Sequence, residues 1–208
     1  VQTCALPIYS GSPFSVMEEQ WLITFRSTIE KVSPLKEEEW EGLLSVIQFR
    51  PFSRHDLIIS EGEVEHFVSF VCGGVLHGYF LKDGDEHTIA FTYKGHYCAS
   101  LGSFMSRSPS RYFIQALSDG MLLSIRHADL QQLYDAYRGI ERWGRISAEQ
   151  VLTGFEWRQA ELMSFSAEER FRLFMSRSAF LCQLVPQKYI ASYLNMTPET
   201  FSRLRKQG

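Results

Sequence analysis

Residues 187–206 read QKYIASYLNMTPETFSRLRK and contain two short runs with helical spacing. Ile190 and Leu194 give the first run an apolar side, and Phe201 and Leu204 give one to the second run. The two apolar sides can bury each other if the chain turns sharply between the runs. The stretch therefore predicts a pair of short helices packed together.

Three residues between the runs favour such a turn. Asn195 stands at the break, and asparagine tolerates the left-handed backbone conformation better than most residues. Thr197 is a good helix N-cap, and Pro198 suits the first position of the next helix. This pattern is typical of a helix-turn-helix, whose second helix contacts DNA bases.

The second helix carries side chains suited to reading DNA. Glu199 and Arg203 are four residues apart, so they share a helix face. A carboxylate accepts a hydrogen bond from cytosine, and arginine binds guanine with two donors. Arg205 and Lys206 suit phosphates. The predicted DNA-binding residues are Lys188, Thr197, Glu199, Thr200, Ser202, Arg203, Arg205 and Lys206. The alternative is an ordinary helical hairpin with an exposed salt bridge between Glu199 and Arg203.

Charge is distributed unevenly along the chain. Residues 167–208 contain seven basic and three acidic residues, a net charge of +4, although the whole chain has a net charge of −3. A basic end on an acidic body indicates an anionic partner for that end, and the helix-turn-helix pattern makes double-stranded DNA the candidate. A solvated helical surface is the plainer interpretation.

Length and composition limit the class of protein. The chain has 208 residues, 45% of them hydrophobic, which suits one large or two small globular domains. No apolar run reaches the roughly 18 residues of a membrane span, so we expect a cytoplasmic protein without membrane contact. The four cysteines are too scattered for a disulfide framework or a metal site.

The chain divides into four segments. Residues 1–16 are interpreted as an artefact or as disordered, because VQTCALPI resembles a translated sequencing adapter and Met17 is a candidate start. Residues 17–131 are predicted to form an antiparallel β-roll preceded by helices, since short Val-, Ile- and Phe-rich runs alternate with glycine turns such as Asp83-Gly84. Residues 132–165 are expected to form a long helix and hinge, and 166–208 the helix-turn-helix domain. The fold class is therefore α+β.

The long helix has an apolar stripe that suggests pairing with a second copy of the chain. A single helix beside a roll cannot easily bury such a stripe alone. The alternative, packing against its own roll, stays open. The predicted dimerisation residues are Ile140, Trp143, Ile146, Val151 and Phe155.

The order of these parts resembles the Crp/Fnr superfamily of bacterial transcription regulators. The resemblance covers residues 21–206 and is carried by FVCGGVLHGYFLKDGDEHTIAF, SAEERFRLFM and VPQKYIASYLNMTPETFSRLRK. The last stretch is similar to the variant common in Bacteroidetes members, which usually have glycine at the position of Asn195. Membership implies a double-stranded β-helix similar to cyclic nucleotide-binding domains, a homodimer and DNA binding. The DNA-binding unit in this sequence is expected to lack the wing that many members carry, either because the protein is a wingless member or because the sequence is truncated.

The resemblance also argues against cyclic AMP bound in the usual mode. Cyclic-AMP-binding members carry a glutamate for the ribose and an arginine for the phosphate, whose positions align with Ser100 and Ser110. Arg111 lies one residue later, and a one-residue shift in a strand turns a side chain to the other face. A different small ligand, or none, is expected. The candidate ligand-binding residues are Ser100, Leu101, Ser103, Ser110, Arg111 and Phe155, and a solvated serine-rich loop is the alternative.

Other functions find less support in the sequence. An iron–sulfur sensor needs clustered cysteines, and His77 and His87 are expected to be half-exposed strand residues, not haem ligands. No nucleophile–base set, phosphate loop or metal motif indicates an enzyme, so no catalytic or metal-binding residue is assigned. The competing hypothesis is a small-molecule-binding roll whose C-terminal helices contact proteins instead of DNA. RNA polymerase is a further candidate partner, without assigned residues.

Overall fold

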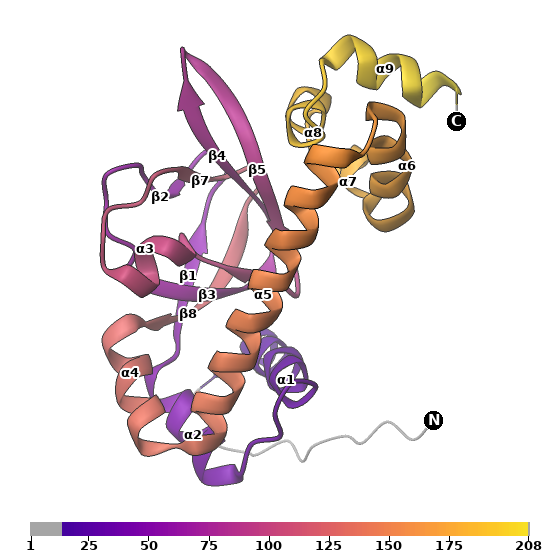
Figure 1. Ribbon diagram of the computed structural model, residues 1–208. Coiled ribbons are helices and arrows are strands. Elements are labelled where there is room, and N and C mark those ends of the chain that lie inside the picture. The colour runs from indigo at the N-terminus through magenta and orange to yellow at the C-terminus, as the bar shows by residue number, and fades with distance from the viewer. Residues whose placement is uncertain (1–13, 208) are drawn as a thin grey trace, which may run out of the picture.

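The computed structural model describes residues 14–207. Two antiparallel sheets form a roll, helices cover one end of it, and a long helix leads to a group of C-terminal helices (Figure 1). Within the described residues, no helix is both long and apolar enough to cross a membrane. This arrangement confirms the predicted α+β fold class.

The first helix begins earlier than expected. Helix α1 spans Val16–Glu30, and α2 spans Glu37–Val46. The Ser15 hydroxyl accepts a hydrogen bond from the backbone N–H of Glu18, whose carboxylate accepts one from Ser15 in return. This capping box fixes the start of α1, so residues 14–16 belong to the fold. The other residues interpreted as an artefact or as disordered, 1–13, lie outside the described residues.

The roll consists of two four-stranded sheets. One has the strand order β1-β8-β3-β6 and the other β2-β7-β4-β5, with every pairing antiparallel. The strands are β1 Gln48–Phe52, β2 Leu57–Ile59, β3 Phe67–Gly73, β4 Val75–Lys82, β5 Asp85–Tyr93, β6 Tyr97–Cys98, β7 Phe113–Ala116 and β8 Gly120–Arg126. A short helix, α3 Leu101–Ser106, separates β6 from β7.

The β4–β5 hairpin shows how a turn signal in the sequence sets the register. Lys82 pairs with Asp85, so the turn contains only Asp83 and Gly84. Their φ values are +56° and +90°, as a two-residue turn that matches strand twist requires. β5 is an edge strand, so one side of its backbone is free for other contacts.

Alternation along the strands separates two apolar layers. Val71, Leu76 and Leu122 are among the residues that fill the roll interior. Phe70 and Leu123, which point to the opposite face of their sheet, pack against helices instead. The roll therefore has an inner core and a second core beneath its helices.

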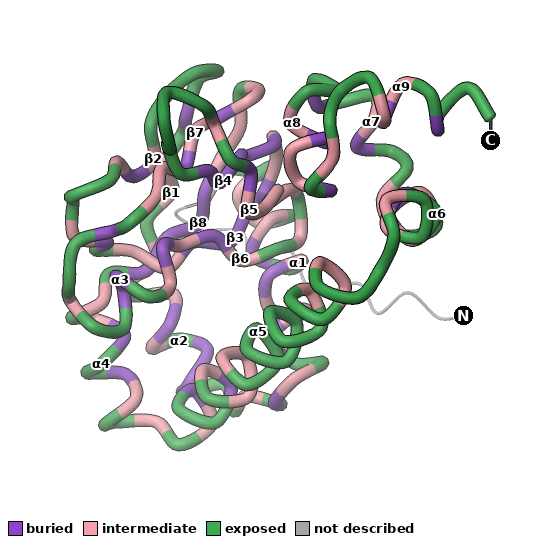
Figure 2. The backbone as a smooth tube through the Cα atoms, turned by 45° about the horizontal axis from the view of Figure 1, so that its top comes forward, coloured by how far each residue is buried: buried purple, intermediate pink, exposed green. Residues whose placement is uncertain are grey.

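The long helix begins later than residue 132. Helix α4 spans His127–Ala136, and α5 spans Arg138–Ser164. Ile140 is 0% exposed and Trp143 is 3% exposed, and both belong to the core beneath the helices. Beyond them α5 is largely exposed (Figure 2).

The C-terminal unit contains four helices around its own core. These are α6 Ala167–Ser178, α7 Leu181–Leu184, α8 Gln187–Tyr193 and α9 Pro198–Gln207. Ser166 and Glu169 form the predicted capping box at the start of α6. The core of the unit also includes Val75 and Phe91 from the β2-β7-β4-β5 sheet, so the unit packs directly on the roll.

Candidate nucleic-acid interface and its attachment to the roll

The turn between α8 and α9 has the predicted left-handed residue. Asn195 has φ +51°, and its N–H donates to the Ser192 carbonyl at 2.9 Å. The N–H of Met196 donates to the Ala191 carbonyl at 3.0 Å. These two bonds form a Schellman motif, which satisfies carbonyls at the end of α8. The break in the sequence therefore sets the angle between the two helices.

The next helix starts and packs as its sequence indicates. The Thr197 hydroxyl accepts a hydrogen bond from the N–H of Thr200 at 3.2 Å, which is an N-cap interaction. Phe201 is 0% exposed, and its ring centroid lies 5.6 Å from that of Phe171. Leu204 is also buried in the core of the unit. One side of α9 is thereby fixed, and the other side remains exposed.

The exposed side of the α8–α9 pair carries most of the predicted DNA-binding residues. Thr200 and Ser202 are half-buried, and Thr197 serves mainly as the cap. A hydrogen bond from its own backbone N–H lowers the pKa of the Glu199 carboxyl, and a hydrogen bond with the Thr197 hydroxyl lowers it further. The Glu199 side chain is therefore an ionised acceptor at neutral pH. Within the described part of the chain, no ion pair joins Glu199 to Arg203. The exposed members are Lys188, Thr197, Glu199, Arg203, Arg205 and Lys206.

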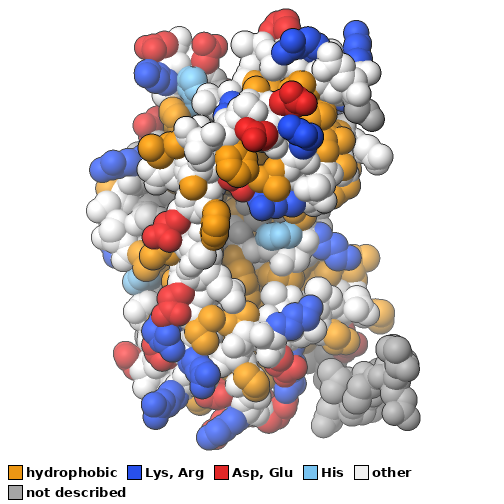
Figure 3. All heavy atoms as spheres, turned by 45° about the vertical axis from the view of Figure 1, so that its right-hand side comes forward, with side chains coloured by type: hydrophobic (Ala, Val, Ile, Leu, Met, Phe, Trp, Pro, Cys, Tyr) orange, Lys and Arg blue, Asp and Glu red, His pale blue; other side chains and the backbone are white. Residues whose placement is uncertain are grey.

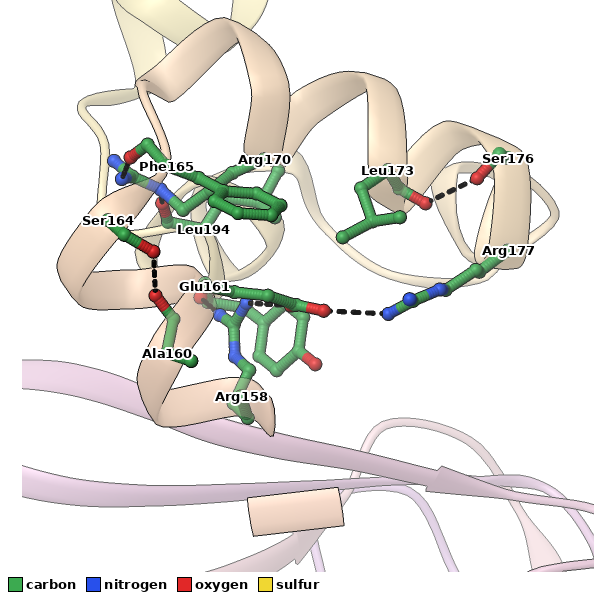
Figure 4. A network of polar contacts seen from close by, with 11 residues as sticks. Arg158, Ala160, Glu161, Ser164, Phe165, Arg170, Leu173, Ser176, Arg177 and Leu194 are labelled. Carbon is green, nitrogen blue, oxygen red and sulfur yellow. Dashed lines mark hydrogen bonds and ion pairs between the residues drawn. The ribbon is translucent and has the colours of Figure 1, made fainter. Parts of the chain in front are cut away.

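Two arginines connect the end of α5 and the start of α6 to the end of α8 (Figure 4). Arg158 donates to the Tyr193 carbonyl, and its guanidinium carbon lies 4.0 Å from the centre of the Tyr193 ring. Arg170 donates to the Leu194 carbonyl at 2.8 Å and to the Asn195 carbonyl at 3.2 Å. The last carbonyls of a helix lack partners within it and carry the negative end of its dipole, so they attract cations.

A carboxylate completes this network. Glu161 on α5 lies 2.8 Å from Arg177 of α6 and 3.4 Å from Arg158. The side chain of Glu161 is only 12% exposed, so these pairs are screened less than surface ion pairs. The hinge between the long helix and the C-terminal unit is therefore held by charged hydrogen bonds. Sequence patterns contained no signal for them.

We call the contact between α8 and β4–β5 the α8–sheet contact. It is formed by His77, Thr88, Phe91, Tyr189 and Ser192. The Ser192 hydroxyl accepts from the Thr88 N–H at 3.0 Å and donates to the Glu86 carbonyl at 3.3 Å. Both backbone groups lie on the edge strand β5, so a serine of the helix-turn-helix unit satisfies part of the free edge of the roll.

His77 lies at the centre of the α8–sheet contact. Its ring centroid is 4.2 Å from that of Tyr189 and 5.6 Å from that of Phe91, and its Nε2 is 2.8 Å from the Thr88 hydroxyl. Nδ1 has no hydrogen-bond partner among the described residues. Burial, with a smaller effect of Lys188, lowers the pKa of His77 to about 4. The expectation of a half-exposed His77 is wrong, because α8 covers this face of the sheet, whereas His87 is exposed.

The serine-rich segment of the roll does not fit a cyclic nucleotide phosphate. The hydroxyls of Ser100 and Ser110 are buried and lie 2.8 Å apart, so they bond to each other. The Ser103 hydroxyl accepts from the N–H of Glu65 at 2.9 Å. Arg111 is exposed.

Glu65 adds a further obstacle to an anion in this segment. Its carboxylate is buried and accepts hydrogen bonds from the N–H groups of Phe67 at 3.0 Å and Ser100 at 3.2 Å. Burial raises the pKa of Glu65, while these bonds act in the opposite direction. The segment is an internally satisfied network rather than an open phosphate site. Of the five serines at positions 100, 103, 106, 108 and 110, only Ser106 and Ser108 are exposed. The alternative of a solvated loop therefore holds for these two alone.

The predicted dimerisation residues separate into two groups. Ile140 and Trp143 are buried in the core of their own chain, which favours for these two the alternative that the stripe packs against its own roll. Ile146 is half-buried. Val151 and Phe155 are 37% and 57% exposed. The α5 surface left for a partner therefore begins near Val151 and includes Leu152, Phe155 and Trp157.

The outward face of α5 and the C-terminal helices is mixed in character. Figure 3 brings this side forward and shows hydrophobic and basic side chains close together. Phe155 is 57% exposed on α5, whereas Ser100, Ser103 and Ser110 are buried, so the candidate ligand-binding residues do not share one environment.

Comparison with known proteins agrees with this geometry. Residues 49–137 match the cyclic nucleotide-binding domain family. FixK2 from Bradyrhizobium japonicum is similar in structure, with a TM-score of 0.68 and 22% identity over 78% of this chain and 84% of that one. The catabolite activator protein of Thermus thermophilus has a TM-score of 0.53 and 22% identity over 83% of each chain. No curated protein matches the sequence.

A third similar structure is the c-di-GMP-responsive global regulator CLP of Xanthomonas campestris. Its TM-score is 0.62, with 16% identity over 83% of this chain and 91% of that one. The fold is that of Crp/Fnr-type regulators. Residues 49–137 match the cyclic nucleotide-binding domain family, and the resemblance stated from the sequence is confirmed at the level of this domain and of the fold.

Proposed function

We propose that the chain is a sequence-specific DNA-binding transcription regulator that acts as a homodimer and responds to a small ligand other than cyclic AMP. The observation that carries the proposal is the exposed side of α9. There Glu199, Arg203 and Lys206 are solvent-accessible on a helix whose other side is fixed by Phe201 and Leu204. A rigid helix with free polar and basic side chains suits the major groove.

Pairing through the exposed part of α5 would give the protein two reading helices. Val151 and Phe155 are apolar side chains that are exposed to water in a single copy, and burying them against a partner favours association. A dimer would place its reading helices on successive major grooves, roughly 34 Å apart. The expected binding site is therefore an inverted repeat.

The α8–sheet contact supports regulation through the roll. It joins the roll directly to α8, the helix that precedes the reading helix. A change in the roll that favours one position of α8 would change the orientation of α9 and the spacing within a dimer. The serine network does not fit a cyclic nucleotide, so we assign no step to one.

The competing function is a ligand-binding roll whose C-terminal helices contact another protein. Apolar side chains near these helices, such as Phe180 at 43% and Leu184 at 52% exposure, are compatible with it. Contact with RNA polymerase would use surfaces to which we assign no residue.

Selection of genomic DNA fragments by the purified protein, followed by sequencing, tests the proposal. The selection is made at two salt concentrations, because contacts to phosphates weaken with salt regardless of sequence. Recovery of an inverted repeat at both concentrations is the expected result. Recovery of random DNA that disappears at the higher concentration would favour the competing function.

A further inference from the structure

A hollow of about 460 Å³ lies where the end of α3 and the start of α4 meet the loop before β3. Its lining consists of four basic side chains and Ala128, and no carboxylate of the described residues takes part in it. The basic residues are His66, Arg107, Arg126 and His127. His66 and Arg126 are exposed and the other two are half-buried, so a solute can reach this group from water. The volume falls within the range of about 300–1,000 Å³ common for small-molecule sites.

The two arginines of the hollow have no charge partner among the described residues. No carboxylate there forms an ion pair with Arg107 or Arg126, whereas Arg177 lies 2.8 Å from Glu161. Glu65 adjoins the hollow in the sequence, but its carboxylate is buried and accepts hydrogen bonds from two backbone N–H groups. The hollow therefore has a positive charge that the described part of the chain does not neutralise.

Hydrogen bonds hold Arg107 in position. Its Nη1 donates to the carbonyls of Glu65 and Phe104, and its Nη2 donates to Nδ1 of His66 at 3.1 Å. An arginine can only donate, so Nδ1 of His66 accepts and the ring hydrogen is on Nε2. An anion would therefore meet a guanidinium that is already ordered and a histidine N–H that can donate, which lowers the entropic cost of binding.

The ring of His127 is sensitive to the charge of the hollow. Burial lowers the pKa of His127, and the neighbouring Arg107 and His66 lower it further. Positive neighbours disfavour another positive charge, whereas an anion close to the ring would favour the protonated form. Binding of an anion should therefore change the titration of His127.

The hollow lies away from the helices proposed to read DNA. It borders β3 and β8, whereas the C-terminal unit packs on the other sheet through Val75 and Phe91. Figure 1 shows α3 and α4 on one side of the roll and α8 and α9 at its opposite end. A duplex held by α9 is therefore not directed into the hollow, and we expect a small molecule as the occupant.

We propose that the hollow binds the phosphate group of a small molecule, with Arg107 and Arg126 as charge partners and His66 and His127 as hydrogen-bond donors. Guanidinium groups match the oxygens of a phosphate and form strong charge-assisted hydrogen bonds with it. A phosphate dianion would balance the two arginine charges. The site does not depend on the proposed DNA-binding function and would remain if the C-terminal helices contacted a protein instead.

Isothermal titration calorimetry with phenyl phosphate tests the site at constant ionic strength. We expect saturable binding of one molecule per chain and none of phenol, which lacks the phosphate. Arg126→Gln removes an exposed guanidinium and should weaken binding at least about tenfold, the effect of a lost charged contact. Binding that is absent, or equal for phenyl phosphate and phenol, would overturn the proposal.

Arg54→Gln is the matched control for the loss of charge. Arg54 is also exposed, but its backbone N–H donates to Asp119, near the opposite end of β8 from Arg126. Its charge is screened from the hollow at physiological salt, so the affinity for phenyl phosphate should change less than about twofold. Equal losses in Arg54→Gln and Arg126→Gln would show a general charge effect and overturn the proposal.

Proton NMR of the histidine rings tests where the anion lies. Sulfate has the shape and charge of a phosphate dianion and keeps its charge between pH 5 and pH 8. In sulfate, compared with chloride at equal ionic strength, the pKa of His127 should rise by at least about 0.5. Arg126→Gln should abolish most of this rise, and the signal of exposed His87 should not respond to the change of salt. An unchanged pKa of His127 would overturn the proposed site.

The phosphates of a polynucleotide are the other source of the same chemistry. Duplex affinity that is unchanged in Arg126→Gln, together with weaker phenyl phosphate binding, supports the small-molecule site. Phenyl phosphate binding by a chain that binds no duplex also supports it, although that result would reject the proposed DNA-binding function. Duplex affinity that falls as much in Arg126→Gln as in Arg205→Ala would assign the hollow to a nucleic-acid surface and overturn the proposal.

Discussion

The Ser192 hydroxyl accepts a hydrogen bond of 3.0 Å from the backbone N–H of Thr88, which joins the helix-turn-helix unit to the edge strand of the roll. Ser192 also donates to the carbonyl of Glu86. One side chain therefore satisfies two neighbouring backbone groups of β5. These two hydrogen bonds join α8 directly to the β4–β5 hairpin.

Removing this hydroxyl should loosen the α8–sheet contact. In Ser192→Ala, the Thr88 N–H and the Glu86 carbonyl lose their partner, at a cost of about 1 kcal/mol. We expect hydrogen exchange at the Thr88 amide to accelerate by about fivefold, with smaller changes in the core of the C-terminal unit. Ser176→Ala serves as the control, because its hydroxyl bonds within α6. Unchanged exchange at Thr88 would mean that the contact does not depend on Ser192.

His77 should make the stability of this contact depend on pH. The pKa of His77 is about 4 in the folded protein, whereas the ordinary value is 6.5. Unfolding between pH 4 and pH 6.5 is therefore accompanied by uptake of a proton. The stabilisation is fully present above pH 6.5 and is lost as the pH falls toward 4. The loss amounts to at most about 3 kcal/mol.

Urea unfolding at several pH values between 7 and 4 checks the contribution of His77. His77→Phe keeps an aromatic ring against Tyr189 and cannot take up a proton. We expect the variant to lose some stability at pH 7, since Thr88 loses a hydrogen bond, and to show a smaller decline on acidification. The same decline in both proteins would assign the pH dependence to carboxylates elsewhere.

Asn195→Ala should destabilise the C-terminal unit by about 1–2 kcal/mol. At φ +51° the Cβ of either residue lies close to the following carbonyl, but the short polar side chain of asparagine can offset this cost by local hydrogen bonding and that of alanine cannot. Asn195→Gly is the matched variant, because glycine adopts positive φ without that clash. Thermal unfolding of the three proteins gives the comparison. A glycine variant as unstable as the alanine variant would show that the asparagine side chain itself is required.

The sequence was sufficient to predict the helix-turn-helix geometry but not its attachment. Asn195 and Thr197 act on residues within one turn, so their roles follow from local chemistry. Ser192 and Thr88 are 104 residues apart, and their bond depends on which face of β4–β5 the unit covers. Strand alternation alone cannot distinguish an outer face exposed to water from one covered by another domain, which is why His77 was expected to be half-exposed.

The same limit explains the division of the stripe on α5. Helical spacing correctly grouped Ile140 and Phe155 as apolar positions. It could not show that the roll covers the first part of α5 and leaves the second part free, because that depends on where the helix crosses the sheet. The two groups consequently lead to opposite expectations on mutation.

Arg203→Ala and Arg205→Ala should differ in their effect on DNA binding, on the basis of the proposed function. Loss of a two-donor contact to guanine should cost about 1–3 kcal/mol on the preferred site and little on random DNA. Loss of a phosphate contact should weaken all sequences alike and reduce the slope of log affinity against log salt by about 0.9. Fluorescence anisotropy with both DNAs measures this. Arg172→Ala removes an equal charge from α6 as a control.

Phe155→Glu should prevent association of two chains and leave the fold intact. The side chain is 57% exposed, so a charge there is solvated in the monomer but would be buried against a partner. Ile140→Ala should act in the opposite way and cost about 2–5 kcal/mol of folding stability, because Ile140 is fully buried in its own chain. Sedimentation equilibrium and thermal unfolding of both variants separate these effects. Gln150→Glu places the same charge on a different side of α5 and should leave both properties unchanged. If Phe155→Glu associates as the unmodified protein does, this part of α5 is not the dimer surface.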